Sequence, residues 1–308
     1  MRAPGWRWWR WLVGAAVVVG VVLVWGGLTV LAQLVQARAA GVDLLDAPSA
    51  EIDELLATWD GLLVTNLSLA GGIVAGLAAA WGWRVPPGYV SSVVGRLRWR
   101  WLLTCVAVAV VVGVLPLVGL QLVVSGPSEA WAPEPRWGLL LLVIVATTPL
   151  QAAGEEYLFR GWLGQTVGSW FAAPLLGAMA SAAVTSTLFA LAHGSQNVWL
   201  FADRFLFGVI AAVLVWWTGG LEAAIALHAV LNVAGLGSAV LAGQLLEGLT
   251  ATSVPASDLL VLQVFTLLPA LVVAVLAQRR GLERFVPPGP LVPASRRVGT
   301  GASGGVQA

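Results

Sequence analysis

Six ionisable or amide side chains in the second half of the chain occur in three short motifs: Glu155, Glu156 and Arg160, then His193, then His228 and Asn232. The two histidines are the only ones in the sequence. All six lie in or beside strongly apolar segments, where a charged side chain costs about 2.5–3.5 kcal/mol at mid-membrane depth. Glutamate and histidine together can activate a water molecule or hold a metal ion. Their presence at this cost predicts hydrolytic chemistry inside a membrane.

The two adjacent glutamates are expected to differ in role. Glu156 and Arg160 are four residues apart, so on a helix they lie one turn apart and can pair. Pairing would hold Glu156 charged and fix its orientation. Glu155 points about 100° away around the helix axis and is predicted to stay free for chemistry.

The two histidine motifs point to a functional site mainly because they occur together with the glutamate motif. His193 ends an apolar stretch that contains Phe189, and His228 stands four residues before Asn232 on one helical face. Taken singly, such residues are more typical of a membrane interface or of contacts between helices. Three such motifs on three apolar segments favour a common site.

The elements that must position these residues are predicted to be membrane-spanning helices. The chain is 59% hydrophobic and 10% charged, whereas a soluble domain has roughly 25% charged residues. Lipid requires backbone hydrogen bonds to be made within each segment, so the sequence predicts an all-α, polytopic membrane bundle of about eight helices. The expected spans are 11–32, 61–83, 101–124, 138–165, 172–192, 198–217, 221–242 and 258–277. The first apolar run is roughly 22 residues long, beyond the ~7–15 of a signal peptide, so we expect a retained anchor.

The arginines predict the orientation. All 16 basic residues are arginine, and twelve precede span one, lie between spans two and three, or follow span eight. Only Arg38 and Arg136 occupy the alternate loops. The positive-inside rule then places both termini in the cytoplasm, in a plasma membrane of bacterial type. No basic patch is interleaved with stacking aromatics, so membrane lipid and a peptide or protein substrate near the membrane are the expected partners, and nucleic acid is not.

We expect four segments along the chain: N-terminal helices with an acidic loop (1–137, scaffold), a catalytic helix core (138–243), a C-terminal membrane helix (244–278) and a disordered cytoplasmic tail (279–308). The acidic loop is predicted to hold a short amphipathic helix capped by Ser49. The arginines of the 84–100 loop are expected to face anionic lipid. Cys105 is expected to be apolar filler, and Asp203 and Arg204 are expected to be structural, with a place near the glutamates or on a water path left open.

The order Glu-Glu-x-x-x-Arg, Phe-x-x-x-His and His-x-x-x-Asn resembles the CPBP intramembrane metalloprotease family. That family includes the CAAX prenyl endopeptidases and bacterial proteins associated with bacteriocin processing and self-immunity. The resemblance covers 149–232 and rests on all three motifs occurring in order.

The resemblance implies a CAAX-type membrane endopeptidase that cleaves a peptide bond with an activated water. It implies Glu155 as general base, His193 as the residue that binds or polarises the water, and His228 and Asn232 as further ligands or oxyanion stabilisers. Glu156 and Arg160 would hold the geometry. A divalent metal, zinc by expectation, would take Glu155, His193 and His228 as ligands. The same residues also permit a metal-free Glu–His dyad, and the sequence leaves both open.

One expectation concerns depth. If the fifth span began at Ala172, His193 would lie up to ~10 Å from the level of Glu155. We therefore expect that helix to begin deeper, after Pro174, or to tilt.

The competing functions are a catalytically silent scaffold or immunity-type binding protein and a proton- or ion-coupled transporter. A silent relative should lose a motif residue, and none is missing here. Transport is disfavoured because the sequence shows no paired broken helices in related halves.

Overall fold

The structure is a computed structural model that describes residues 7–44, 46–125, 131–286 and 291. Helices are the only regular elements in these residues, apart from an isolated bridge between Ser92 and Gly220. The first six helical segments are α1 (Arg10–Ala40), α2 (Ser49–Leu56), α3 (Trp59–Trp83), α4 (Gly88–Ser91), α5 (Trp99–Val108) and the π-helix η1 (Ala109–Val114). The others are α6 (Leu115–Ser125), α7 (Trp137–Glu156), the π-helix η2 (Tyr157–Leu163), α8 (Gly164–Ser169), α9 (Pro174–Leu191), α10 (Val198–Thr218), α11 (Glu222–Ala242), α12 (Leu245–Thr250) and α13 (Ala256–Arg279).

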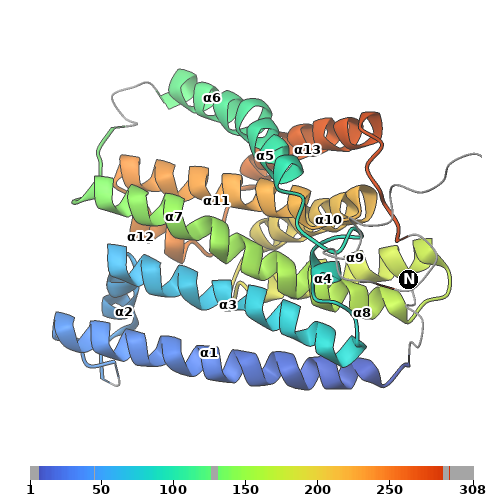
Figure 1. Ribbon diagram of the computed structural model, residues 1–308. Helices are drawn as coiled ribbons and strands as arrows, with labels where there is room; N and C mark the ends of the chain where they lie inside the picture. Colours follow the sequence, from blue (N-terminus) through green and yellow to red (C-terminus); the bar gives the residue numbers. More distant parts are fainter. Residues whose placement is uncertain (1–6, 45, 126–130, 287–290, 292–308) are drawn as a thin grey trace, which may run out of the picture.

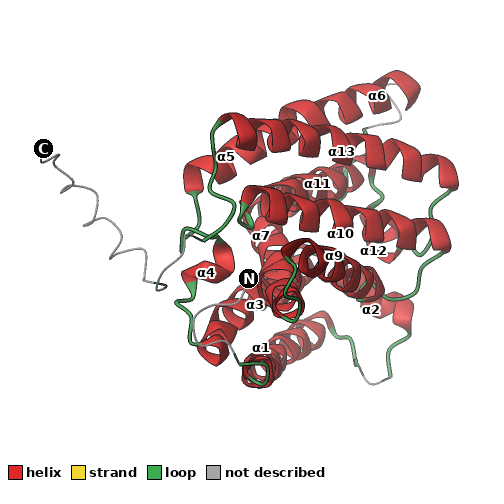
Figure 2. Ribbon diagram, turned by 90° about the vertical axis from the view of Figure 1, so that its right-hand side faces the viewer, coloured by secondary structure: helices red, strands yellow, loops and turns green. Residues whose placement is uncertain are grey.

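The long helices form a bundle centred on α7 and α11 (Figures 1 and 2). In Figure 1, α1, α3, α7 and α11 follow one another from bottom to top, each packed on the next. The segment of α5 and η1 packs on the far side of α11, and α13 packs on η1. Helix α10 packs against both α9 and α13, and also against α11. As a result, α7 and α11 are covered by other helices on several sides.

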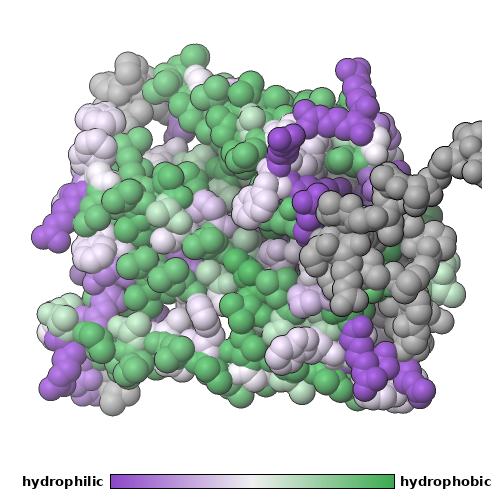
Figure 3. Space-filling view, in the orientation of Figure 1, coloured by the Kyte–Doolittle hydropathy of each residue, from purple (hydrophilic) through white to green (hydrophobic). Residues whose placement is uncertain are grey.

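Eight helical segments in the described residues are long and apolar enough to cross a membrane. They run from 18 to 33 residues, and each overlaps one of the eight predicted spans. Hydrophobic residues cover the middle of the face seen in Figure 3, and hydrophilic residues gather toward its two ends. The chain is therefore an integral multi-pass membrane protein, and the predicted all-helical fold is confirmed.

The helix boundaries agree with the sequence prediction except at a few ends. Helix α1 runs to Ala40, eight residues past the predicted end, because no helix-breaking residue occurs before Gly41, which adopts a φ of 78°. Helix α9 begins at Pro174 with the proline in its first turn, as the expected depth of His193 required.

Helices α3 and α7 pack backbone to backbone beside the glutamates. A side chain on Gly72 would collide with the carbonyl of Gly154, and one on Gly154 would collide with the carbonyl of Leu69. Small residues allow this close approach in membrane bundles. The buried Asn66 of α3 also donates to Thr147 and Thr148 of α7, over 2.8 and 3.1 Å. The sequence prediction missed this polar contact in the second span.

Two local predictions were wrong. Helix α2 forms as expected, but Pro48 occupies the N-cap position, and Ser49 is already helical and makes no capping hydrogen bond. In the 84–100 segment Arg98 does not face lipid, because it turns inward to pair with Glu222.

The start of the predicted tail packs on the bundle, with the Arg284 guanidinium 4.3 Å from the Trp217 ring centroid. Residues 287–290 and 292–308 of that tail lie outside the described residues.

Candidate active site

The centre of the site is an ion pair at the junction of α7 and η2. Glu156 is the last residue of α7, and its Oε1 lies 3.0 Å from Nη1 of Arg160 in η2. The two side chains are 0% and 1% exposed, so each charge depends on the other for compensation. The predicted pair at four-residue spacing is confirmed. The π-helical turn was not predicted, and such turns occur frequently at functional sites.

His228 of α11 lies between the two glutamates. Its Nδ1 is 2.9 Å from Oε1 of Glu156, and its Nε2 is 3.6 Å from Oε2 of Glu155. An ionised carboxylate can only accept, so Nδ1 donates its hydrogen to Glu156. In the neutral imidazole the lone pair of Nε2 then faces Glu155.

Glu155 is held by an amide that the sequence prediction missed. Nε2 of Gln151 donates to Oε1 of Glu155 over 2.6 Å, and Nδ2 of Asn232 donates to Oε1 of Gln151 over 3.2 Å. The other carboxylate oxygen, Oε2, is buried and has no hydrogen-bond partner among the described residues. Gln151 could have been found as an amide one turn before Glu155 on the same face of an apolar span.

His193 follows the last turn of α9. Its Nδ1 lies 2.7 Å from the carbonyl oxygen of Phe189 and must donate to it, which leaves a lone pair on Nε2. Burial lowers the pKa of His193 below its usual range, although the nearby Glu155 carboxylate acts in the opposite direction. The neutral ring is therefore favoured.

A cavity of about 400 Å³ brings Glu155 and His193 together. Its other walls are largely apolar and come from α1, α3, η2 and the end of α9, with Trp25, Leu158 and Phe159 among them. The two residues therefore face one space. With α9 starting at Pro174, His193 lies at a depth from which it reaches the same cavity as Glu155. Because α1 and α3 line this cavity, the first part of the chain contributes directly to the site.

An aromatic cluster closes the site on the side of α9 and α10. The ring of Phe189 lies 5.7 Å from that of His228, and the ring of Phe207 lies 4.9 Å from it. The guanidinium of Arg160 sits 4.5 Å from the Phe189 ring centroid. These rings exclude water around the ion pair and strengthen its electrostatic interactions.

Residues 136–234, from the residue before α7 to the middle of α11, match the sequence model of the family described as type II CAAX prenyl endopeptidase Rce1-like. The chain carries an Rce1-like domain. All six predicted site residues lie within this domain, and so does Gln151. The predicted family resemblance is confirmed. Searches of curated proteins and of solved structures returned no significant match.

The residues of the Rce1-like domain fit a metal only in part. The 3.6 Å between Oε2 of Glu155 and Nε2 of His228 is near the ligand separation of a tetrahedral zinc site, roughly 3.4 Å. The bond from His228 to Glu156 also resembles the outer carboxylate of many metal-bound histidines. However, no three His, Cys, Asp or Glu residues of the described chain come close enough to hold an ion. Of the three predicted ligands, only Glu155 and His228 lie at a separation that suits a shared ion.

Asp203 and Arg204 of α10 lie outside this network. Asp203 accepts from Gln263 of α13 over 2.8 Å, and Arg204 donates to Gln196 over 2.6 Å. Both contacts tie α10 to its neighbours, which agrees with the predicted structural role.

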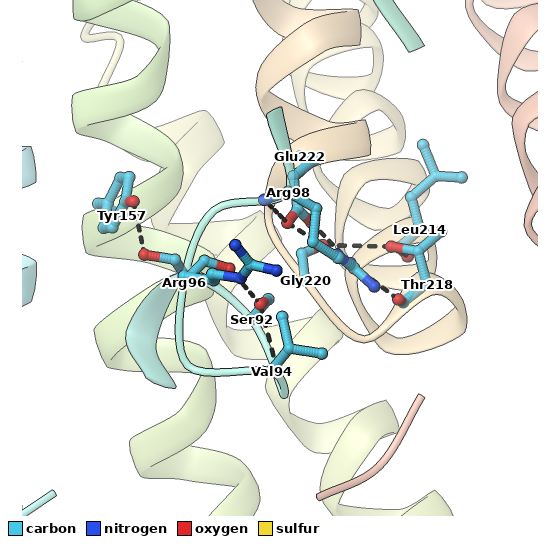
Figure 4. Close-up of polar contacts among 10 residues, drawn as sticks. Ser92, Val94, Arg96, Arg98, Tyr157, Leu214, Thr218, Gly220 and Glu222 are labelled. Carbon is cyan, nitrogen blue, oxygen red and sulfur yellow. Dashed lines mark hydrogen bonds and ion pairs between the residues drawn. The ribbon is translucent and has the colours of Figure 1, made fainter. Parts of the chain in front are cut away.

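A second buried ion pair holds the start of α11, and the sequence prediction missed it (Figure 4). Nε and Nη2 of Arg98 donate to the two carboxylate oxygens of Glu222 over 2.9 and 2.7 Å, and Nη2 also donates to the carbonyl of Thr218. Glu222 is fully buried. Since His228 lies less than two turns further along α11, this pair helps to fix its depth.

Proposed function

We propose that the protein is an intramembrane endopeptidase of the CAAX type that hydrolyses a peptide bond with a water activated by Glu155 and His193. One observation carries this proposal. The buried Oε2 of Glu155 has no hydrogen-bond partner among the described residues and lies beside a histidine nitrogen, and Glu155 lines a cavity together with His193.

In the proposed reaction a water sits between Glu155 and His193. Glu155 takes a proton as the water oxygen bonds to the peptide carbonyl carbon. The lone pair on Nε2 of His193 accepts a hydrogen bond from the water. The negative charge that develops on the carbonyl oxygen needs a hydrogen-bond donor, for which we propose the amide of Asn232. Glu155 then returns the proton to the amine nitrogen as the C–N bond breaks. Atoms and charge balance with no further reactant.

The other site residues are assigned to positioning. Asn232 and Gln151 orient the base, because their amides form a chain that ends on Oε1 of Glu155. Glu156 and Arg160 fix the ring of His228 through its Nδ1. Zinc is a separate proposal: Glu155 and His228 are the two expected ligands that lie close enough together to hold it, and a bound metal would lower the pKa of its water toward ~7.

The cavity suggests the kind of substrate. Its walls carry Val22, Trp25, Leu69, Leu158 and Phe159, so an apolar group should lie next to the scissile bond. We propose a peptide or protein substrate at the membrane, with prenylated and unprenylated forms both to be tested. We also propose that both termini lie in the cytoplasm, because Arg7, Arg284 and part of the arginine-flanked 84–100 segment line one cavity and so lie at the same end of the bundle.

The test is cleavage of a peptide library by the detergent-purified protein, with and without a chelator. The library contains CAAX-type peptides with and without a prenyl group. Wild-type protein should cleave at least one class, and the Glu155→Gln variant should not. Activity that survives in protein shown by elemental analysis to be metal-free would remove zinc from the proposal. Equal turnover by both proteins, or none by wild type on any peptide, would favour the silent scaffold.

A further inference from the structure

A second and larger cavity lies at the end of the bundle where both described chain ends meet. Its volume is about 600 Å³, and its wall includes the start of α1, the 85–93 segment, α8, the end of α10 and residues 284–286. Glu155 and His193 are not among its described lining residues. Of the residues assigned to the proposed chemistry, only Arg160 lines this cavity, so the reaction itself takes place elsewhere.

The described wall carries positive charge and no negative side chain. Arg7, Arg10, Arg160 and Arg284 line the cavity, and no Asp or Glu is among its described lining residues. A concave surface of one charge sign with apolar walls concentrates ligands of the opposite charge. The cavity therefore favours an anion.

Several buried donors in the same wall lack acceptors. Nε and Nη2 of Arg160, Nε of Arg284 and Nε1 of Trp216 have no hydrogen-bond partner among the described residues. Arg160 already uses Nη1 on Glu156, and its side chain is only 1% exposed. Groups of this kind are normally satisfied in native proteins. Because all four nitrogens are donors, a ligand that satisfied them would have to present acceptor oxygens.

Part of the remaining wall is apolar. It includes Ala178, Ala212 and Val215 of α9 and α10, and Trp8 and Trp11 near the start of α1 also line the cavity. Tryptophan is typical of the level of lipid headgroups. A small soluble anion would leave this apolar part unfilled, whereas an amphiphile would cover it.

We propose that this cavity binds an anionic phospholipid, with the phosphate among the arginines and the start of an acyl chain along the apolar wall. Phosphate oxygens suit guanidinium donors, and basic pockets between membrane helices on the cytoplasmic side are a known type of headgroup site. The size is within the ~300–1,000 Å³ typical of small-molecule pockets. The proposal does not depend on the peptidase assignment.

The first test is native mass spectrometry of the full chain in detergent, titrated with phosphatidylglycerol or phosphatidylcholine. We expect one phosphatidylglycerol to be retained at least ~10-fold more tightly than phosphatidylcholine. Equal retention of both lipids would overturn the proposal, because headgroup charge would then not matter. Inorganic phosphate is titrated separately, and displacement of the lipid by phosphate alone at similar concentration would assign the site to a free anion.

The second test is the variant Arg7→Gln/Arg284→Gln, with Arg100→Gln as control. Arg100 is an exposed arginine of α5 that does not line the cavity. Loss of two charge-assisted contacts should weaken phosphatidylglycerol binding by about 10-fold or more, and the control should change it by less than about twofold. Equal losses in both proteins would assign binding to surface charge in general and overturn the site.

A third measurement needs no variant and covers the case in which the double variant misfolds. A photoreactive phosphatidylglycerol is crosslinked to wild-type protein and the labelled peptides are mapped. We expect labels near Trp8, Trp11 and Val215. Labels confined to other helices, or displacement of the lipid by a peptide with a free C-terminal carboxylate, would overturn the lipid assignment.

Discussion

Glu155 and Glu156 are adjacent, but neutralising them should affect different properties: Glu155→Gln should lower the rate of peptide cleavage, and Glu156→Gln should lower the stability of the fold. Glu155→Gln keeps the shape of the side chain and its contact with Gln151, and it removes the base. We expect peptide cleavage to fall by at least about 100-fold, the lower end of what a general base contributes. The free energy of unfolding should change by less than about 1 kcal/mol, because Oε2 of Glu155 makes no hydrogen bond among the described residues.

Glu156→Gln should instead destabilise the fold. The carboxylate is fully buried and 3.0 Å from Arg160, and two unit charges at that distance attract by about 5.5 kcal/mol at an effective dielectric of about 20. Desolvation offsets part of this attraction, and removing one partner of a buried pair costs about 3–5 kcal/mol. At roughly 2 °C per kcal/mol for a chain of this size, the melting temperature should fall by roughly 6–10 °C.

The assay measures kcat/KM on a cleaved peptide and the melting temperature in the same detergent for each variant. Glu54→Gln is the matched control, because Glu54 is an exposed carboxylate of α2. A Glu155→Gln variant that cleaves within tenfold of wild type would refute the role of the base. A Glu156→Gln variant that melts within about 2 °C of wild type would refute the argument from burial.

Three further predictions concern topology, pH and the second ion pair. A cysteine at Ser49 should react with an impermeant maleimide in intact cells, and one at Glu283 should not. Burial lowers the pKa of His193, so the active neutral ring should persist below pH 6.5, and the acid limb of kcat/KM attributable to His193 should have its midpoint below that pH. Arg98→Met should lower the free energy of unfolding by about 3–5 kcal/mol, measured by thermal melting, because it leaves the carboxylate of Glu222 buried without its cation.

Each of these has a control or a contrary outcome. The native Cys105 is buried and free, so it should give little background labelling, and reversed labelling of the two sites would exclude the proposed orientation. An acid midpoint above 6.5 that disappears in His193→Gln would contradict the effect of burial on this ring. Arg100→Met is the control for Arg98→Met, and similar melting of the two variants would mean that the Arg98–Glu222 pair adds no stability.

The sequence by itself determined the helices and the local half of the site. Continuous apolar stretches are enough to specify membrane spans, because lipid leaves the backbone no alternative to a helix. The pairing of Glu156 with Arg160 followed from their four-residue spacing, since helical periodicity fixes which neighbours share a face. The order of the three motifs was also enough to indicate the family.

Only the tertiary structure decided which helices meet and through which side chains. His228 contacts Glu156 and Glu155 from 72 and 73 residues away along the chain, and Arg98 pairs with Glu222 across 124 residues. Spacing within one helix carries no information about such contacts. They depend on how each helix is rotated and how deeply it sits, and in lipid this is set by close packing and a few polar contacts rather than by hydrophobicity. The contact of Gly72 with Gly154 and the π-helical turn after Glu156 set that rotation around Glu155, so its place in the cavity could not be predicted from the sequence.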